Sequence, residues 1–480
     1  MGVLSELEPK SVFGYFEEIT RIPHGSGNVD RISDYLVEFA KKQGLFYRQD
    51  ELKNVILVKE ATPGYEEKPA VILQGHMDMV AVKKPGCEID LEKEGLRVAV
   101  EGDRVYAEGT SLGGDDGIAV AYALALLSSD TLKHPKLEVI LTVDEEVGMD
   151  GARGIDLSGL TGHRMINLDS EEEGIFLTSC AGGARVKCRI PVAESPAEGL
   201  TYRVTVDGLL GGHSGGEIHK ERGNSNCLFG RLLYRLCQRM PVRLAELQGG
   251  LADNAIPRET TGLLVIRKED SESFGALLDT VEKELQGELS GKDPGLRIRA
   301  VEEEGKTTCI SAEDTLRTAA FLWSLPNGVQ AMSADMPGLV ETSLNLGILQ
   351  YKDGTVCAEF SVRSSVESAK KALIRKLQAV TGLAGGEAEV SGDYPGWRFR
   401  KDSPLREKMV ALYEEMYGEK PRVEAIHAGL ECGILGSKIE DLDCVSMGPD
   451  MRDIHTTEET LSISSVRRVW EYLVRLLESV

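Results

Sequence analysis

The stretch Val71-Ile-Leu-Gln-Gly-His76-Met-Asp78-Met-Val80 decides how the rest of the chain is interpreted. Its apolar start is the pattern of a β-strand that is buried on both faces. His76 and Asp78 follow where such a strand ends and a loop begins. An imidazole can bind a metal ion there, while the nearby carboxylate holds the ring in its orientation. The alternative is a strand-end histidine that only satisfies backbone groups, and this stretch alone leaves both open.

The composition is that of a globular protein with an acidic surface. The chain has 480 residues, of which 41% are hydrophobic and 28% charged, with room for two or three domains. The net charge of −23 repels phosphate backbones, so we expect no nucleic-acid partner. No apolar run reaches the length of a membrane-spanning helix, so we expect no membrane partner either. The nine cysteines are scattered without a C-x-x-C pair, which is typical of reduced thiols in the cytoplasm.

Two further apolar runs end in acidic residues. Residues 137–143 are followed by Asp144-Glu145-Glu146, and residues 165–168 are followed by Asp169. Each acidic cluster alone is more typical of a solvated loop. Open α/β sheets, however, bind ligands at the carboxyl ends of their strands. Three such strand ends, including the one at His76, therefore predict a site at one edge of a sheet.

A glycine-rich loop at residues 109–114 leads through Asp115 and Asp116 into an Ala/Leu-rich helix. Carboxylates are favoured at helix N-termini, so one of the two aspartates could be only a cap. The glycines do not indicate a phosphate loop, because no Gly-Lys-Ser/Thr follows and the local charge is negative.

The order of predicted strands and helices in the middle of the chain differs from that at both ends. From about residue 184 strands and helices alternate in another order, and a strand-strand-helix pattern beginning near Asn254 recurs weakly from Met336. We therefore expect an inserted α+β domain, with internal duplication as an open alternative. After Tyr394-Pro-Gly-Trp397 the α/β pattern of the first part of the chain returns. The predicted fold is α/β with a mixed sheet, in which residues 1–183 and 398–480 form one discontinuous domain and residues 184–397 the insertion.

The chain has only eight histidines, and two of them combine with the strand-end acids into a metal-ligand set. This set suits zinc, with manganese or cobalt as alternatives. One bridging carboxylate, with one histidine and one further carboxylate for each ion, would hold two ions about 3.5–4 Å apart. The predicted ligands are His76, Asp115, Glu146, Asp169 and His455.

A general base is needed beside the water that two such ions would share, and Glu145 is the predicted residue. Adjacent side chains of an extended segment point to opposite sides, so Glu146 could bind metal while Glu145 faces the water.

These motifs resemble, in order and spacing, those of the di-zinc peptidase family that includes carnosinase, glutamate carboxypeptidase and a bacterial tripeptidase. Within it the chain most resembles the aminoacyl-histidine dipeptidases. The resemblance extends over residues 10–478. Supporting motifs are Asp-Glu-Glu-x-Gly-Met, Gly-Gly-His213-Ser-Gly-Gly-Glu-Ile-His, Tyr-Pro-Gly-Trp and Ile-His-Ala-Gly-Leu-Glu-Cys-Gly.

The resemblance implies a role for each metal ligand. His76 and Asp169 would bind one ion, Glu146 and His455 the other, and Asp115 would bridge them. Two catalytic residues follow from the same comparison: Asp78 would orient His76, and Glu145 would be the general base.

The resemblance also implies that the inserted domain is a lid that contacts substrate. His213 would stabilise an oxyanion or hold the substrate, and Arg363 would bind a terminal carboxylate, with a structural strand-end arginine as the alternative. Gly429 and Glu431 would line the same pocket. Asn254 lies in a family-like Asn-x-Ile-Pro stretch. No role is implied for Asp116, His219 or His427.

The sequence therefore predicts a cytoplasmic metallodipeptidase that hydrolyses short peptides, including Xaa-His dipeptides, as a monomer or homodimer. Two alternatives are other enzymes on the same frame: a tripeptidase or aminopeptidase, and an N-acyl amino acid deacylase. A third is a catalytically silent peptide-binding protein, which the complete set of ligands and the general base argue against.

Overall fold

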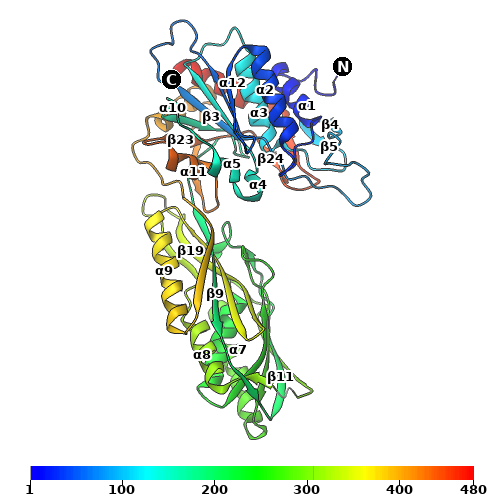
Figure 1. Cartoon of the computed structure of the whole chain (residues 1–480), viewed down its shortest axis with the longest axis vertical. Coiled ribbons are helices and arrows are strands. Elements are labelled where there is room, and N and C mark those ends of the chain that lie inside the picture. Colours follow the sequence, from blue (N-terminus) through cyan, green and yellow to red (C-terminus); the bar gives the residue numbers. More distant parts are fainter. Residues whose placement is uncertain (1, 306–307) are drawn as a thin grey trace. The chain divides into compact units, whose positions relative to one another are not determined.

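The computed structural model describes residues 2–305 and 308–480 and divides into two compact units (Figure 1). Unit 1 comprises Met1–Ser179, Phe399–Ala425 and Leu430–Val480, and unit 2 comprises Cys180–Arg398 and Ile426–Gly429. Each unit has a hydrophobic core of its own. The functions that the sequence assigns to a catalytic part and a lid part stay predictions.

Unit 1 is built on an eight-stranded mixed sheet and a small four-stranded sheet. The large sheet has the order β1 (Phe46–Gln49), β2 (Val55–Lys59), β6 (Leu137–Thr142), β3 (Val71–His76), β7 (Arg164–Asn167), β23 (Asp443–Ser446), β8 (Ile175–Cys180) and β22 (Arg422–Ile426). The small sheet has the order β24 (Met451–Arg452), β25 (Thr460–Ser462), β5 (Arg104–Ala107) and β4 (Val98–Glu101). The helices are α1 (Lys10–Thr20), α2 (Asp30–Gln43), α3 (Gly114–Ser128), α4 (Glu145–Gly148), α5 (Asp150–Gly154), α10 (Pro404–Tyr417), α11 (Glu431–Lys438) and α12 (Ile463–Ser479).

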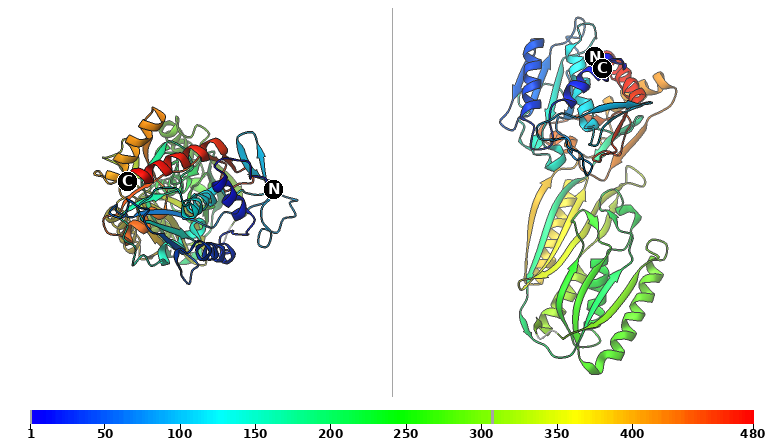
Figure 2. Two further views of the ribbon diagram at one scale, coloured as in Figure 1. Left: turned by 90° about the horizontal axis from the view of Figure 1, so that it is seen from above. Right: turned by 90° about the vertical axis from the view of Figure 1, so that its right-hand side faces the viewer.

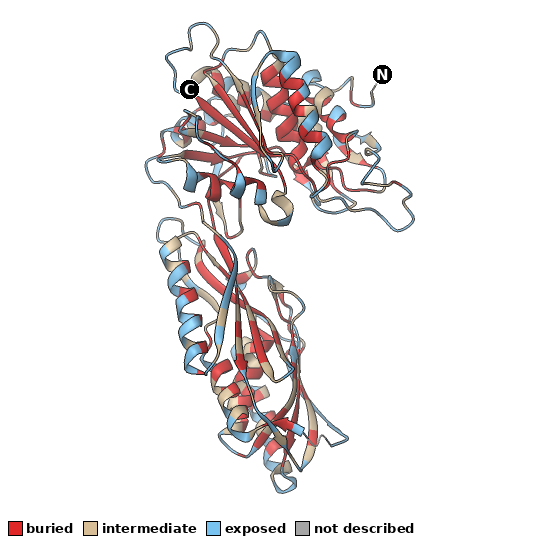
Figure 3. Cartoon of the chain, viewed as in Figure 1, coloured by how far each residue is buried: buried red, intermediate tan, exposed pale blue. Residues whose placement is uncertain are grey.

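The centre of this sheet is parallel, which brings several strand ends to one edge. Strand β3 runs parallel to β6 on one side and to β7 on the other, and β7 runs parallel to β23. Every residue of β3 and of β6 is buried, as Figure 3 shows by colour. The uninterrupted apolar starts of these strands are what burial on both faces requires.

The helices of unit 1 differ in how much of their surface is buried. Helix α3 is apolar and is buried from Gly114 to Leu127, and it packs on α1 and β3. Helix α12 is amphipathic, because its buried residues, among them Val466, Val469 and Leu473, recur at helical spacing on one face. Ser403 caps α10 by accepting a hydrogen bond from the backbone of Arg406.

Unit 2 is a nine-stranded sheet with helices and two small ribbons. Its strands are β9 (Gly182–Pro191), β10 (Glu194–Pro196), β11 (Leu200–Asp207), β12 (Gly212–His213), β13 (Val242–Gly249), β14 (Ala255–Ile256), β15 (Thr260–Ile266), β16 (Arg297–Glu303), β17 (Thr308–Ile310), β18 (Gly328–Met332), β19 (Val340–Lys352), β20 (Thr355–Ser364) and β21 (Glu387–Tyr394). Its helices are η1 (Ile218–Lys220), α6 (Ser225–Cys237), η2 (Lys268–Asp270), α7 (Ser271–Leu289), α8 (Ala312–Ser324) and α9 (Glu367–Leu383).

The large sheet of unit 2 is two copies of one topology joined edge to edge. The inner copy runs β11, α6, β13, β15, α7, β16, and its strands lie in the order β16-β11-β15-β13. The outer copy runs β9, α8, β19, β20, α9, β21, and its strands lie in the order β21-β9-β20-β19. Both copies therefore place their fourth, first, third and second strands side by side. The copies meet where β13 pairs with β19, seen in Figure 2 as green strands beside yellow ones.

This topology agrees with the predicted duplication and explains why the repeat is weak in the sequence. The inner copy is inserted after the first strand of the outer copy, so that β9 is separated from its own helix α8 by more than a hundred residues. Only the second half of each copy, strand-strand-helix, is continuous enough to be recognised in the sequence.

The prediction of an extended backbone at Glu145 and Glu146 is wrong. These residues open the short helix α4 and are not extended, because Asp144 before them adopts a left-handed conformation with φ of 55°. The argument that adjacent side chains point to opposite sides therefore does not hold here. Neighbouring side chains on a helix diverge by about 100°.

Candidate metal centre

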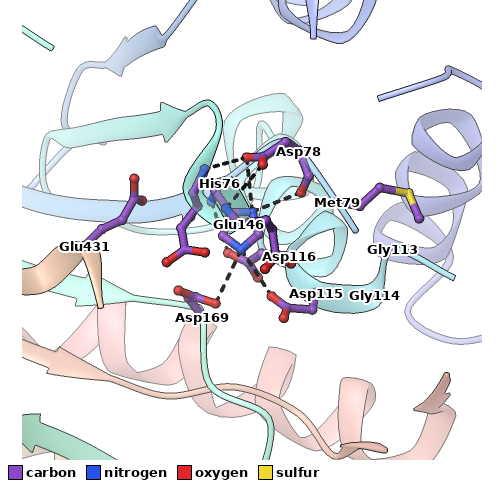
Figure 4. A network of polar contacts seen from close by, with 12 residues as sticks. His76, Asp78, Met79, Gly113, Gly114, Asp115, Asp116, Glu146, Asp169 and Glu431 are labelled. Carbon is purple, nitrogen blue, oxygen red and sulfur yellow. Dashed lines mark hydrogen bonds and ion pairs between the residues drawn. The ribbon is translucent and has the colours of Figure 1, made fainter. Parts of the chain in front are cut away.

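Histidine and carboxylate side chains gather at the edge where the parallel strands of unit 1 end (Figure 4). His76 is the last residue of β3, and Asp169 follows β7 by two residues. Glu146 follows the end of β6 by four residues. Parallel neighbours end at the same edge, so residues from distant segments meet there. Asp115, at the start of α3, and His455 complete this strand-edge cluster, which consists of His76, Asp115, Glu146, Asp169 and His455.

His76 lies at the centre of the cluster and is almost fully buried. Its Nε2 atom is 3.2 Å from Asp115 Oδ1 and 3.6 Å from Asp169 Oδ1. Burial works against a charged imidazole, but the hydrogen bonds to these carboxylates and to Asp78 outweigh it. The pKa of His76 is therefore well above its usual value.

His455 approaches the same aspartate from the other side. Its Nε2 atom is 3.1 Å from Asp115 Oδ2 and 2.9 Å from Glu146 Oε1. Hydrogen bonds to these two carboxylates raise the pKa of His455 to about 10. The two oxygens of Asp115 thus face one imidazole each.

These distances fit a site for divalent cations. Ligand atoms of His76, Asp115 and Glu146 all lie within 4.8 Å of one another, and so do those of His76, Asp116 and Asp169. Neighbouring ligands of a tetrahedral ion at about 2.0 Å are separated by about 3.3 Å, which is close to the spacing found around Asp115. Each imidazole Nε2 faces two carboxylates, so a cation bound here would have nitrogen and oxygen ligands.

Asp78 connects His76 to the segment that carries Glu145 and Glu146. Its Oδ1 atom is 3.5 Å from His76 Nδ1, and its backbone oxygen is 3.0 Å from the same nitrogen. Its carboxylate also accepts hydrogen bonds from the backbone N–H groups of Glu145 and Glu146, at 3.1 and 3.4 Å, and from the hydroxyl of Ser26. Burial alone would raise the pKa of Asp78, but the hydrogen bond to His76 and the other donors lower it overall.

Asp116 is a buried carboxylate to which the sequence assigns no role. Its Oδ2 atom accepts the backbone N–H of His76 at 3.2 Å, and a Cβ atom at Gly75 would lie only 2.5 Å from that oxygen. Glycine at position 75 is thus what makes room for the aspartate. Burial and the neighbouring Asp169 raise the pKa of Asp116 well above its usual value.

The N-terminus of α3 is capped by neither of its aspartates. Gly113 occupies the N-cap position with a left-handed φ of 68°, and the peptide bond between Asp115 and Asp116 is cis. The free backbone N–H groups instead bind the carboxylate of Glu459, which the sequence analysis missed. Its one sequence signal is its position four residues after His455.

Glu145 lies beside the strand-edge cluster, directly before Glu146 in α4. Burial and the nearby carboxylates of Asp169, Glu431 and Glu146 raise its pKa well above its usual value, against the opposing effect of His76. Burial likewise raises the pKa of Asp169 to about 6. The cluster thus holds more negative charge than its surroundings balance, and bound cations would offset it.

A network of hydrogen-bonded, buried polar side chains connects Glu431 with the central strands of the sheet. Glu431 Oε2 accepts hydrogen bonds from Gln74 and from Thr142, both at 2.6 Å, and the Gln74 carbonyl oxygen accepts one from Asn167 at 2.5 Å. These contacts link α11 to β3, β6 and β7. Glu431 is fully buried, and burial raises its pKa to about 8. Its predicted contact with substrate stays a prediction.

Two of the predicted substrate contacts in unit 2 are neighbours. Strand β12, which ends at His213, pairs with β14, and the backbone oxygen of Asn254 accepts the N–H of Ser214 at 2.8 Å. His213 and Asn254 both line a cavity of about 920 Å³. The Nδ1 atom of His213 accepts hydrogen bonds from the N–H groups of Gly215 and Gly216, so that Nε2 carries the proton of the neutral ring.

Arg363 lies close to His213 in unit 2. A Cβ atom at Gly215 would lie 3.1 Å from His213 Cε1, 3.3 Å from Arg363 Nε and 2.7 Å from the backbone oxygen of His427. Only glycine therefore fits between these groups. We call His213, Arg363 and His427 the Arg363 cluster.

The Arg363 cluster is electrically the opposite of the strand-edge cluster. Within the described part of the chain, the buried Nε atom of Arg363 has no hydrogen-bond acceptor. His427 Nε2 is 2.7 Å from the hydroxyl of Ser343, and burial together with Arg363 lowers the pKa of His427 to about 4. The neighbouring Ala428 accepts the N–H of Ala181, which holds the segment of Gly429 in unit 2.

Comparison with known proteins places the chain in a family. Residues 72–479 match Peptidase family M20/M25/M40, and the chain belongs to this family. The predictions of the fold class and of a metal-dependent peptidase are thereby confirmed.

Full-length relatives support the same assignment. The chain is 35% identical to the cytosol non-specific dipeptidase of Escherichia coli K12, over 100% of this chain and 99% of the relative. The crystal structure of an aminoacylhistidine dipeptidase from Vibrio alginolyticus matches with a TM-score of 0.95 and 37% identity, over 99% and 98% of the two chains. A tripeptidase structure from Staphylococcus aureus matches with a TM-score of 0.55 and 15% identity, over 98% of each chain, which shows a shared fold only.

Proposed function

We propose that this protein is a cytoplasmic metallodipeptidase that hydrolyses dipeptides, including those with a C-terminal histidine. The observation that supports it most is the strand-edge cluster, in which Asp115 lies between His76 and His455 with Glu145 beside it. The names of the two full-length relatives, a dipeptidase from the cytosol and an aminoacylhistidine dipeptidase, support the substrate class and the compartment. No helix in the described residues is long and apolar enough to cross a bilayer.

The metal ligands we propose are His76 and Asp169 for one ion, Glu146 and His455 for the other, and Asp115 between them. The donor set of imidazoles and carboxylates favours zinc, with manganese and cobalt as alternatives. Two such ions, when bound, polarise a substrate carbonyl and lower the pKa of a shared water molecule.

Proton transfer is the role we propose for Glu145. A general base works best when its pKa is near the operating pH, and burial raises the pKa of Glu145. Its carboxylate would accept a proton from the attacking water and deliver it to the leaving amine nitrogen. Asp78 would keep His76 in orientation through its contacts with Nδ1.

Substrate recognition is the role we propose for unit 2. The guanidinium of Arg363, with its unpaired Nε, suits the terminal carboxylate of a dipeptide. The Nε2–H group of His213 would donate to the oxyanion, and Asn254 and Gly429 would contact the peptide. A monomer and a homodimer both remain compatible with this proposal.

Metal analysis combined with a substrate panel tests the proposal. We expect about two divalent ions for each chain, and hydrolysis of carnosine and other dipeptides at rates far above those for a tripeptide or an acetyl amino acid. Removal of metal with a chelator should abolish dipeptide hydrolysis, and added zinc should restore it. Undiminished hydrolysis by metal-free protein would refute the metal centre, and a preference for tripeptides would refute the substrate class.

A further inference from the structure

Glu459 is a buried glutamate whose carboxylate is bound by consecutive backbone groups. Only 3% of it is exposed. Its Oε2 atom accepts the N–H groups of Leu112 and Gly113 at 2.8 and 3.1 Å. Its Oε1 atom accepts those of Gly114 and Asp115 at 2.8 and 3.5 Å. All four donors belong to the loop that opens α3.

We propose that Glu459 is a positioning residue that holds Asp115 and His455 in register for divalent cations. It links the two loops that carry these residues, because it receives the backbone of Asp115 and itself follows His455 by four residues. The inference rests on the proposed metal centre and adds to it a residue that contacts neither metal nor substrate.

Next to Asp115 the loop consists of Gly113 and Gly114, which have no side chains to hold it, and this makes the external carboxylate important. A Cβ atom at Gly113 would lie 2.7 Å from Met79 Sδ, and one at Gly114 would lie 3.2 Å from Met451 Sδ. Gly113 also has a left-handed φ of 68°, which favours glycine there, and glycine leaves a backbone free to move. Four hydrogen bonds to one buried carboxylate remove that freedom and fix where the Asp115 side chain begins.

The loop of His455 also needs an anchor. Asp453 and His455 both adopt left-handed backbone conformations, with φ of 52° and 62°, which are unfavourable for non-glycine residues. Glu459 ends this turn, and the next residue, Thr460, begins β25 and pairs with Tyr106 of β5. Its buried carboxylate thus ties the end of this turn to the backbone of the α3 loop.

The two acceptor oxygens of the carboxylate are essential to this role. Both of its oxygens accept hydrogen bonds, and a negative charge at a helix N-terminus is favoured by the helix dipole. A glutamine has nearly the same shape but presents one oxygen and one NH₂ group. In Glu459→Gln, two backbone donors would therefore face another donor.

Glu138 provides a matched control at the opposite end of β6. It is fully buried, and its carboxylate accepts the N–H of Thr161 at 2.9 and 3.0 Å and that of Gly162 at 2.9 Å. Glu138→Gln thus makes the same chemical change in a similar backbone cradle, far along the strand from the strand-edge cluster.

The experiment is a zinc titration of metal-depleted full-length wild type, Glu459→Gln and Glu138→Gln, followed by dipeptide kinetics at saturating zinc. Two zinc ions are expected to bind with different affinities. We expect the affinity of the weaker site to be about 10- to 100-fold lower in Glu459→Gln than in wild type, the usual effect of losing a residue that orients a ligand. Its kcat should fall while KM stays near that of wild type. Glu138→Gln should lower the thermal midpoint but keep zinc affinity within about 3-fold of wild type.

The inference is overturned if Glu459→Gln binds zinc as wild type does, or if Glu138→Gln loses as much zinc affinity as Glu459→Gln. If Glu459→Gln does not fold, Glu459→Asp decides, because it keeps the charge and shortens the reach. Zinc affinity reduced about 3-fold or more supports the inference, and unchanged affinity refutes it. A wild type that binds no divalent ion would instead defeat the proposed function itself.

Discussion

The strand-edge cluster of unit 1 and the Arg363 cluster of unit 2 are built in opposite ways. In unit 1, parallel strands bring His76, Glu146 and Asp169 to one edge of the sheet, and the carboxylates of the cluster outnumber its imidazoles. In unit 2, β12, β20 and the returning segment Ile426–Gly429 bring a guanidinium and two neutral imidazoles together. One cluster is rich in carboxylates, whereas the other holds a guanidinium whose buried Nε has no acceptor among the described residues.

In the proposed function this difference assigns chemistry to one cluster and recognition to the other. In the strand-edge cluster, Asp78 and Glu459 accept hydrogen bonds from the backbone of the segments that lead to Glu146 and Asp115. The Arg363 cluster relies on one glycine, Gly215, to let its side chains approach. We therefore expect substitutions in the strand-edge cluster to change kcat and metal affinity, and substitution of Arg363 in unit 2 to change KM.

The largest expected effect comes from Glu145→Gln, which removes the proposed base and keeps the shape. We expect kcat for a dipeptide to fall by about 10³-fold or more. Metal content should stay at the wild-type level, because Glu145 is not among the proposed ligands. Glu458→Gln is the matched control, since Glu458 is an exposed glutamate paired with Lys84 at 2.6 Å. Steady-state kinetics with metal analysis would contradict the role if Glu145→Gln kept more than a tenth of the activity.

An intermediate effect is expected from acid on the Arg363 cluster. The folded pKa of His427 is about 4, while an unfolded histidine has a pKa of about 6.5. Above about pH 6.5 both states are neutral at this residue, so it contributes no pH dependence. Below that pH His427 becomes protonated in the unfolded state but stays neutral in the folded state. The free energy of unfolding therefore falls until about pH 4.

We therefore expect metal-free wild type to lose about 2 kcal/mol more stability than His427→Gln between about pH 7.5 and pH 5. Urea unfolding at the two pH values measures this difference, and groups common to both proteins cancel. Equal losses in wild type and variant would show that His427 does not carry this pH dependence.

The smallest expected effect is that of Arg363→Lys. Lysine keeps the charge but loses the planar fork that pairs with a carboxylate. We expect KM for a dipeptide to rise about 10-fold, with kcat changed about 3-fold at most. Arg185→Lys in the neighbouring strand β9, where Arg185 pairs with Asp253, serves as control. A fall in kcat with unchanged KM would move Arg363 from recognition to the chemical step.

Much of unit 1 could be predicted because its signals are local. The apolar run before His76 and the run that precedes Asp144 both correspond to observed buried strands. The conformation of Glu145 and Glu146 was predicted incorrectly, because a left-handed Asp144 turns the chain into a helix where the pattern indicated an extended segment.

Unit 2 and the supports of the site were harder to predict. The outer copy of the sheet is interrupted by the inner one, so that strands paired in space are far apart in the chain. Glu459 reaches the α3 loop across more than three hundred residues, and Glu431 reaches Gln74 over a similar separation. No local pattern marks such contacts.

The sequence by itself determined which residue types stand at the ends of buried strands, and hence the class of chemistry. That was possible because burial on both faces imposes an uninterrupted apolar run, and the polar residues after it are conspicuous. Only the tertiary structure decided that Asp115 lies between two imidazoles, that Glu459 rather than an aspartate caps α3, and that Gly215 separates His213 from Arg363. These facts depend on distances between segments that only the folded chain brings together.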